Sequence, residues 1–214
     1  MDKQVQKFRE HNNSLLPKWY KWELHFLMNL VLFLFFFAIG VKKIDWYSIL
    51  TPLYLLAAIF IWGLIEYAIH RFILHGNVFS FLHFKKEHTI YHHTFFDEKN
   101  MNMQSAHDLN RTLLRPIDIF SVLALNFCLS MLLSGVLGVK GAAYIYLGGI
   151  IYLFLYECLH ALTHYYRGKN TFLNGIKEHH RKHHIKETMN QYNFAVVFPF
   201  IDQVFMTFDK KGIR

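Results

Sequence analysis

The chain of 214 residues contains only two cysteines, Cys128 and Cys158, and both lie inside apolar runs. Two thiols in such places argue against a disulfide framework and against a zinc site built from thiolates. The first 23 residues are polar and charged, so the sequence lacks the short apolar segment and small-residue cleavage site of a secretory signal. We therefore expect neither a disulfide-bonded secreted protein nor a cysteine-based metal site.

Acidic residues are also scarce, with 15 Asp and Glu against 23 Lys and Arg and a formal net charge of +8. The basic residues are distributed around hydrophobic segments instead of following one soluble face, so we expect no nucleic-acid partner. Apolar residues make up 53% of the chain and 22 residues are Phe, a composition that favours a lipid-facing protein. The length suits one domain, and we predict a single membrane domain over residues 1–214.

Charged residues are almost absent from four apolar runs, each close to the ~20 residues that a helix needs to cross a bilayer. The runs cover residues 24–41, 47–66, 117–138 and 142–159. The pattern predicts an all-α fold with four transmembrane helices arranged as two hairpins. Buried helices of a soluble bundle are one alternative, and re-entrant helices are another, mainly for the last two runs. Residues 1–23 contain Trp19, Tyr20 and Trp22, and we expect them to lie at the membrane interface.

The basic residues predict the orientation of these hairpins. Of 23 Lys and Arg, 20 lie in residues 1–23, 67–115 and 161–214, and only Lys42, Lys43 and Lys140 lie in the hairpin turns. By the positive-inside tendency, both termini and the middle segment face the cytoplasm. The compact chain without an organelle signal favours a bacterial inner membrane over the endoplasmic reticulum.

Histidine is in large excess, with 15 residues, and most of them follow the second and fourth apolar runs. Each of these runs is followed by a histidine pair and then a histidine triplet, so the arrangement occurs twice, offset by about 90 residues. Glu66-Tyr67 precedes the first pair and Tyr156-Glu157 precedes the second. The motifs, within residues 66–93 and 157–184, are His70-x4-His75, His88-x3-His92-His93, His160-x3-His164 and His180-x2-His183-His184.

The spacing predicts how the rings would lie on helices. His160 and His164 share a helical face, as do His88 and His92, and the last motif places its three histidines at i, i+3 and i+4. His70 and His75 are five residues apart, and in a regular helix their rings would diverge by about 140°. We therefore expect either that the helix ends between them or that the two rings serve different metal ions.

Converging imidazoles are ligands for transition metals, which accept neutral ring nitrogens. Ten of them exceed the four ligands of a tetrahedral zinc site and suggest two ions with about five ligands each. An all-nitrogen site with open positions favours redox iron, although imidazole also binds zinc, copper and nickel.

Together these motifs resemble the histidine signature of the membrane fatty acid hydroxylase and sterol desaturase superfamily. The segment Glu66-Tyr67-x2-His70-Arg71-Phe72 is particularly similar to the fatty acid 2-hydroxylase and carotene hydroxylase branches. Residues 194–207 resemble the segment that follows the last motif in that family, and the whole resemblance covers about residues 62–208. The second motif is one residue longer than the His-x2-His-His form of the hydroxylase branch, which leaves His83 as an alternative to His88.

The resemblance implies a helical membrane domain, two iron ions, molecular oxygen and a lipid substrate. With the orientation indicated by the basic residues, we predict four membrane helices and a cytoplasmic helical cap that holds the two metal ions. Zinc is a possible substitute for iron in purified protein. No cytochrome b5 domain is fused, so electrons would come from a separate cytochrome b5-like or ferredoxin-like donor. The implied metal ligands are His70, His75, His88, His92, His93, His160, His164, His180, His183 and His184.

Three carboxylates are predicted to support the ligands. Glu66, Glu157 and Asp202 could each accept the second ring N–H of a ligand histidine and fix its orientation. The function expected is that of an oxidoreductase, an oxygen-dependent hydroxylase acting on a lipid, with a fatty acyl chain as the favoured substrate. Within the same superfamily the alternatives are an acyl or sterol desaturase and a carotenoid hydroxylase. A membrane metal transporter is the alternative from another class, disfavoured because only His25 lies inside an apolar run.

Overall fold

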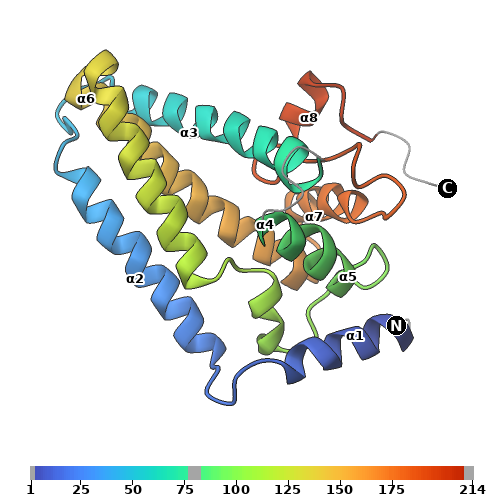
Figure 1. Cartoon of the computed structure of the whole chain (residues 1–214). Helices are drawn as coiled ribbons and strands as arrows, with labels where there is room; N and C mark the ends of the chain where they lie inside the picture. The colour runs from blue at the N-terminus through green and yellow to red at the C-terminus, as the bar shows by residue number, and fades with distance from the viewer. Residues whose placement is uncertain (1–2, 77–82, 210–214) are drawn as a thin grey trace. The chain divides into compact units, whose positions relative to one another are not determined.

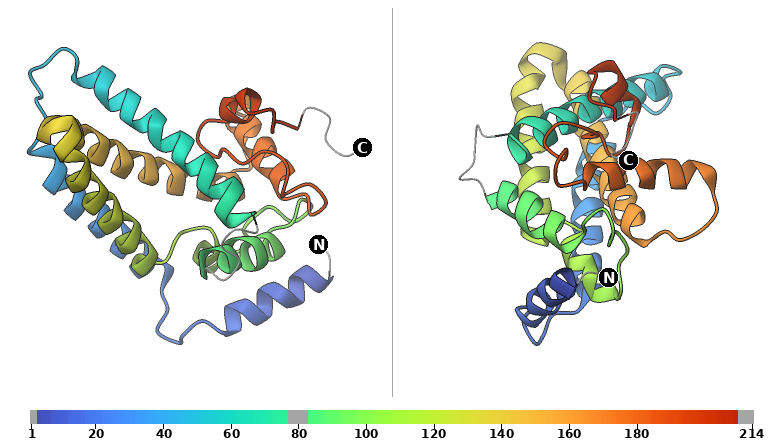
Figure 2. Two further views of the ribbon diagram at one scale, coloured as in Figure 1. Left: turned by 45° about the horizontal axis from the view of Figure 1, so that its top comes forward. Right: turned by 90° about the vertical axis from the view of Figure 1, so that its right-hand side faces the viewer.

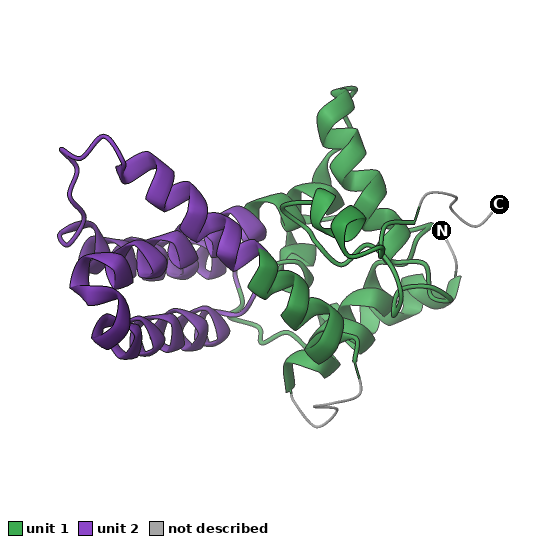
Figure 3. Ribbon diagram, turned by 90° about the horizontal axis from the view of Figure 1, so that it is seen from above, with its two compact units in different colours: residues 1–20, 64–113, 158–214 green, residues 21–63, 114–157 purple. Residues whose placement is uncertain are grey.

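The computed structural model describes residues 3–76 and 83–209, which contain helices and connecting segments but no strand (Figure 1). The predicted all-α fold is confirmed. The chain divides into two compact units, coloured separately in Figure 3. We call residues 21–63 and 114–157 the hairpin unit, and residues 1–20, 64–113 and 158–214 the histidine unit.

The hairpin unit is built from long apolar helices. These are α2 (Trp22–Val41), most of α3 (Thr51–Ala68) and most of α6 (Pro116–Tyr165). Within the described residues, three segments are long and apolar enough to cross a bilayer, namely residues 22–41, 51–74 and 106–165. The chain is therefore a multi-pass membrane protein, while the predicted number of four crossings stays a prediction.

Helix α6 contains the third and fourth predicted runs and reverses direction at Gly138 (φ 69°, ψ 164°). This conformation is nearly restricted to glycine, because a Cβ atom would clash with the backbone. Figure 1 shows the two arms of α6 lying side by side. The first arm packs Ile119 and Leu123 with Tyr146 and Ile150 of the second. The predicted second hairpin is thus present, with its turn at Gly138 instead of residues 139–141.

The hairpin unit exposes an apolar surface, as expected of helices that face lipid. Leu34, Leu132 and Val136 are among its exposed side chains. Inside the unit, α3 and the second arm of α6 come so close that a Cβ atom at Gly148 would lie 2.5 Å from the Cβ atom of Ala58. Glycine at this position allows the two helices to touch through their backbones.

The histidine unit consists of short elements around the end of α6. They are α1 (Lys3–Ser14), η1 (Ile69–Leu74), α4 (His83–Lys85), η2 (Lys86–His92), α5 (His93–Phe95), η3 (Ala106–Arg111), α7 (Thr171–His183) and α8 (Phe200–Val204). The elements η1 and η2 are π-helices and η3 is a 3₁₀-helix. Figure 2 shows α1 beside the segment that contains η3, which the Arg111–Asn12 hydrogen bond joins to it.

Candidate metal centre

All ten histidines of the four motifs gather in the histidine unit. They come from η1 and the residue after it, from η2 and α5, from the last turns of α6, and from the C-terminal turns of α7. Helix α7 begins at a capped N-terminus, where the Asn170 side chain accepts the N–H of Leu173 (3.1 Å). That start places the histidines of α7 in its last two turns, facing the other motifs.

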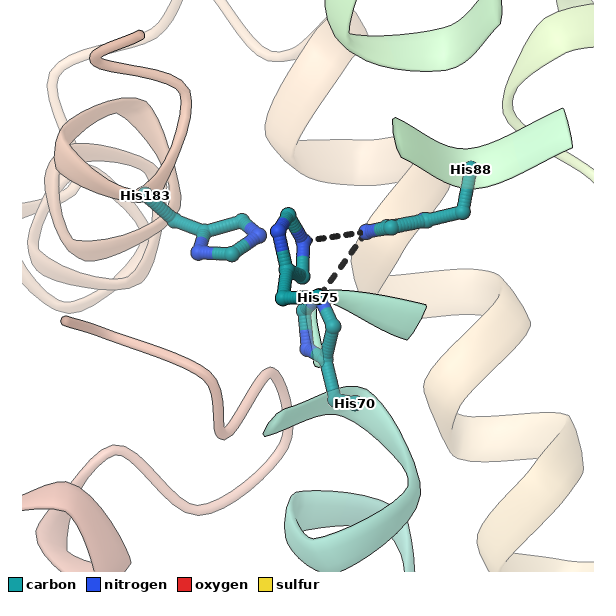
Figure 4. Close-up of side chains that lie close together, drawn as sticks. All are labelled: His70, His75, His88 and His183. Carbon is teal, nitrogen blue, oxygen red and sulfur yellow. Dashed lines mark hydrogen bonds between the residues drawn. The ribbon is translucent and has the colours of Figure 1, made fainter. Parts of the chain in front are cut away.

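The first histidine group consists of His70, His75, His88 and His183, with His93 beside them. The four rings point toward one another in Figure 4. The Nε2 atom of His88 lies 2.9 Å from that of His70, 3.1 Å from that of His75 and 3.2 Å from that of His93. One small region therefore collects nitrogens from three different elements.

The second histidine group consists of His92, His160, His164 and His180, with His184 beside them. The Nε2 atoms of His160 and His92 are 3.1 Å apart. The Nε2 atom of His180 lies 3.1 Å from those of His164 and His184. The two groups adjoin, since the rings of His93 and His184 stack with centroids 4.2 Å apart.

A π-helix resolves the five-residue spacing of the first motif. The N–H of His75 donates to the carbonyl of His70 (3.0 Å), the i→i+5 bond that defines this helix. Such a turn brings residues five apart onto one face, so His70 and His75 serve the same group. The helix does end between them, at Leu74, which is one of the two expectations from the sequence. The other expectation, that the two rings serve different ions, does not describe this arrangement.

The same geometry corrects the interpretation of the second motif. Element η2 is also a π-helix, and the N–H of His93 bonds to the carbonyl of His88. His88 and His93 therefore belong to the first group, whereas His92 belongs to the second. The prediction that His88 and His92 share a helical face assumed a regular α-helix, and in the π-helix the two residues belong to different groups. His83, the alternative ligand, is half exposed and lies 3.6 Å from Glu87, away from both groups.

The two groups have matching composition. Each group contains the histidine pair and two histidines of the triplet from one half of the sequence. Its fifth histidine comes from the triplet of the other half. The exchanged residues are His92 and His183, the middle histidines of their triplets. The sequence repeat thus becomes an approximate two-fold arrangement in which each half completes the other half's group.

Most of the rings are oriented by a hydrogen bond from Nδ1. The acceptors for the second group are backbone carbonyls: Phe96 for His184, Met101 for His164 (2.9 Å), Arg111 for His92 (2.6 Å) and Thr112 for His160 (3.0 Å). Those for the first group are Phe194 O for His70, Asn190 Oδ1 for His75 (3.0 Å) and Tyr192 O for His183 (3.1 Å). Because an oxygen acceptor requires a proton on Nδ1, the Nε2 atom carries the lone pair.

This tautomer tests whether a metal fits the site. Lone pairs on Nε2 that face one another at 2.9–3.2 Å repel, unless a cation lies between them. An ion with metal–nitrogen bonds of about 2.1 Å holds neighbouring ligands roughly 3.0–3.4 Å apart, depending on its geometry. The Nε2 atom of His183 is buried and has no hydrogen-bond partner among the residues described. The donor set therefore fits two transition-metal ions.

The electrostatics of the groups also favours neutral rings. Burial, followed by repulsion from His70, lowers the pKa of His75 to about 3. Burial is likewise the main cause that lowers the pKa of other ligands well below the usual value. These are His88, His92, His93, His180, His183 and His184. Neutral imidazole is the form that binds a metal.

The three predicted carboxylates have different surroundings. Glu66 Oε1 lies 3.5 Å from His70 Nδ1, which donates to the carbonyl of Phe194. Asp202 accepts the N–H groups of Phe194 (2.9 Å) and Ala195 (2.8 Å), and so supports His70 through the backbone. In the hairpin unit, Glu157 accepts the N–H of Leu114 (2.9 Å). Their direct support of ligand histidines stays a prediction.

A further buried histidine, His179, lies next to the histidines of the last motif in sequence but outside both groups. His179 Nε2 donates to Asp202 Oδ2 (3.1 Å), and its ring stacks on Phe208. Sequence reasoning did not identify the Nδ1 acceptors, since most are backbone carbonyls, which any residue supplies. Asn190 is the one side chain among these acceptors. Its place as a polar residue shortly after the last histidine motif was the only feature of the sequence that could have identified it.

Comparisons with known proteins agree with this fold. Residues 55–207 match the family model for fatty acid hydroxylase. The chain is 31% identical over 169 residues to a fatty acid 2-hydroxylase of Macaca fascicularis, an alignment that covers 74% of this chain and 39% of the relative. It is 27% identical over 161 residues to the ceramide very long chain fatty acid hydroxylase scs7 of Schizosaccharomyces pombe, covering 72% of this chain and 42% of the relative.

A solved structure of full-length scs7p, in which only the hydroxylase domain is visible, is similar in fold. The TM-score is 0.58 and the identity 21%, with 90% of this chain and 69% of that chain covered. The chain spans less than half the length of the curated relatives it matches.

Proposed function

The chain belongs to the fatty acid hydroxylase family, and on this premise we propose that it is an oxygen-dependent hydroxylase of lipid acyl chains. The observation that carries the proposal is the convergence of ten histidines, with seven tautomers set by Nδ1 acceptors, into two adjoining groups. Two relatives are named for hydroxylation of fatty acids or ceramide fatty acids. The product to look for first is an acyl chain hydroxylated beside its carbonyl carbon.

The proposed cofactor is a pair of iron ions, one in each histidine group, with zinc as a substitute in purified protein. When bound and reduced, iron would supply the oxygen chemistry that inserts one oxygen atom into an unactivated C–H bond. The other oxygen atom leaves as water, which requires two electrons and two protons from outside the chain. The all-imidazole donor set supports this assignment, since both groups consist of histidine alone.

The residues of the chain contribute position and exclusion of water. The backbone carbonyls and Asn190 hold the rings in one orientation, so that little reorganisation accompanies metal binding. Phe96 and Phe194 are fully buried and pack on His164 and His70, with ring centroids 4.2 Å and 5.8 Å apart. Their apolar rings keep bulk water from the ligands, which protects a reactive centre from side reactions.

The proposed partners follow from the reaction. The substrate is a lipid in the membrane, and the electrons come from a separate cytochrome b5-like or ferredoxin-like donor. The distribution of basic residues supports a cytoplasmic location for both histidine groups and both termini. The membrane proposed is a bacterial inner membrane, in preference to the endoplasmic reticulum.

Lipid mass spectrometry on cells with and without the protein tests the proposal. Growth under isotopically heavy oxygen gas should give an acyl species that carries one labelled oxygen, absent from cells that make the His164→Ala variant. A species that has lost two hydrogens and gained no oxygen would assign the protein to the desaturases. Unchanged lipids, with altered metal content of the cells, would favour a transporter and overturn the proposal.

A further inference from the structure

Helix α1 presents two buried polar side chains to the histidine unit. Arg9 and Asn12 are 3% and 2% exposed and lie three residues apart, on one helical face. Lys7, on the same helix, is exposed. Burial of a guanidinium is costly unless its N–H groups are hydrogen-bonded, so the partners of Arg9 indicate why the fold retains it.

Arg9 binds backbone carbonyls of the segment that follows the second histidine motif. Its Nε donates to Phe95 O (2.7 Å), its Nη1 to Asn102 O (3.1 Å) and its Nη2 to Asn100 O. The guanidinium also lies over the rings of Phe95 and Phe96, 4.9 Å and 5.0 Å from their centroids. One side chain thus fixes both ends of residues 95–102.

The carbonyls that Arg9 holds are sequence neighbours of carbonyls that hold metal-group histidines. Phe96 O accepts from His184, and Met101 O accepts from His164 (2.9 Å). Arg9 donates to the carbonyls of Asn100 and Asn102, the two neighbours of Met101 in sequence. It also donates to the carbonyl of Phe95, which precedes Phe96. A shift of this segment would therefore displace two acceptors of the second histidine group together.

Asn12 acts on the remaining acceptors of the same group. Its Oδ1 accepts from Arg111 Nη2 (2.7 Å), while the backbone carbonyl of Arg111 accepts from His92 (2.6 Å). The next carbonyl, Thr112 O, accepts from His160 (3.0 Å). All four acceptors of the second group thus lie on segments that α1 holds. The acceptors of the first group lie in residues 190–194 instead.

We propose that Arg9, assisted by Asn12, is a positioning residue for the second histidine group and that α1 supports one metal ion of the pair selectively. The inference rests on the proposed function, because it requires that each group binds an ion. It assigns α1 a part in the centre in addition to its predicted place at the membrane interface.

The test measures metal retention in single-group backgrounds. The His75→Ala protein should keep one ion, in the second group, and the His164→Ala protein should keep one ion, in the first. In the His75→Ala protein, whose ion lies in the second group, adding Arg9→Met should speed ion loss to a chelator at least about tenfold. This follows because outer ligand partners typically contribute 10–100-fold to affinity. In the His164→Ala protein, whose ion lies in the first group, adding Arg9→Met should leave the rate of ion loss unchanged. Lys7→Met is the matched control in both.

Each outcome decides between the possibilities. Equal acceleration in both backgrounds, or loss of helical circular dichroism with Arg9→Met, would show a general structural role and overturn the inference. No acceleration in either background would overturn it as well. Arg9→Lys provides a milder variant that keeps the charge but not the three-carbonyl contact, and it should give an intermediate rate. Wild-type protein that binds no metal would instead refute the proposed function.

Discussion

Each imidazole of the two histidine groups carries two nitrogens, and at the scale of single residues the fold gives them different surroundings. One nitrogen of His164, for example, donates to Met101 O, and the other faces His180. The convergence of these histidines could be predicted because four spaced motifs in one chain are a strong signal, while their role as metal ligands stays a prediction. The acceptors could not be predicted, because a backbone carbonyl has no sequence signature and its position depends on the folded segments.

Removal of the metal ions is expected to destabilise the protein, because it leaves the Nε2 lone pairs facing one another. Each ion at a free concentration a thousandfold above its Kd stabilises by about 4 kcal/mol. Thermal unfolding in detergent should therefore shift downward by on the order of 10 °C after chelation. Iron or zinc should restore it, whereas Mg²⁺ should not, because it requires oxygen ligands. Full recovery with Mg²⁺ would contradict the assignment of a nitrogen-ligand site.

His183→Ala is expected to remove one ion and abolish product formation, because His183 completes the first group from the other half of the chain. We expect a fall in hydroxylated product of at least about 100-fold, the upper end of what outer ligand partners contribute. Arg181→Gln is the control, since its guanidinium pairs with Glu178 (2.6 Å) at the surface. Elemental analysis and lipid mass spectrometry measure the two effects. A His183→Ala protein with both ions and full activity would exclude this ligand.

At the scale of elements, the histidine unit depends on helical geometry that spacing alone does not reveal. The pair His160 and His164 lies in an α-helix, as predicted, whereas His70 lies in the π-helix η1 and His75 is the residue after it. A π-turn has no distinct residue preference in this sequence, so the prediction assumed regular helices and placed His88 and His92 on one face.

Three glycines of α6 are expected to respond differently to alanine. A Cβ atom at Gly135 meets nothing within 4 Å, so Gly135→Ala should stabilise by up to about 1 kcal/mol. Gly148→Ala should destabilise by ~1–3 kcal/mol, because the new methyl meets Ala58. Gly138→Ala also has space, but its φ of 69° should cost a similar ~1–3 kcal/mol. Thermal unfolding of the three variants measures these effects, and equal responses would exclude the described turn and helix contact.

At the scale of the whole molecule, the sequence repeat and the structure coincide in the histidine unit. Apolar run length was enough to predict helices, because a continuous stretch of Leu, Phe and Ile has no competing polar face. It was not enough to locate the turn of the second hairpin, since Lys140 suggested a turn two residues beyond Gly138. The side of the membrane on which each segment lies depends on the distribution of charge.

Cysteine labelling tests the predicted topology, since 20 of 23 basic residues lie in segments expected to face the cytoplasm. Lys99→Cys and Lys169→Cys, at exposed positions of the histidine unit, should react only from the cytoplasmic side in a background without Cys128 and Cys158. Lys43→Cys and Lys140→Cys, exposed in the hairpin turns, should react from the opposite side if both hairpins cross fully. Resistance of the turn positions alone to outside reagent would indicate re-entrant hairpins and leave the enzyme assignment intact.

Reaction of Lys99→Cys and Lys169→Cys from opposite sides would place the two halves of the repeat on different faces of the membrane. Because each half completes the other half's histidine group, that result would be incompatible with a shared metal centre.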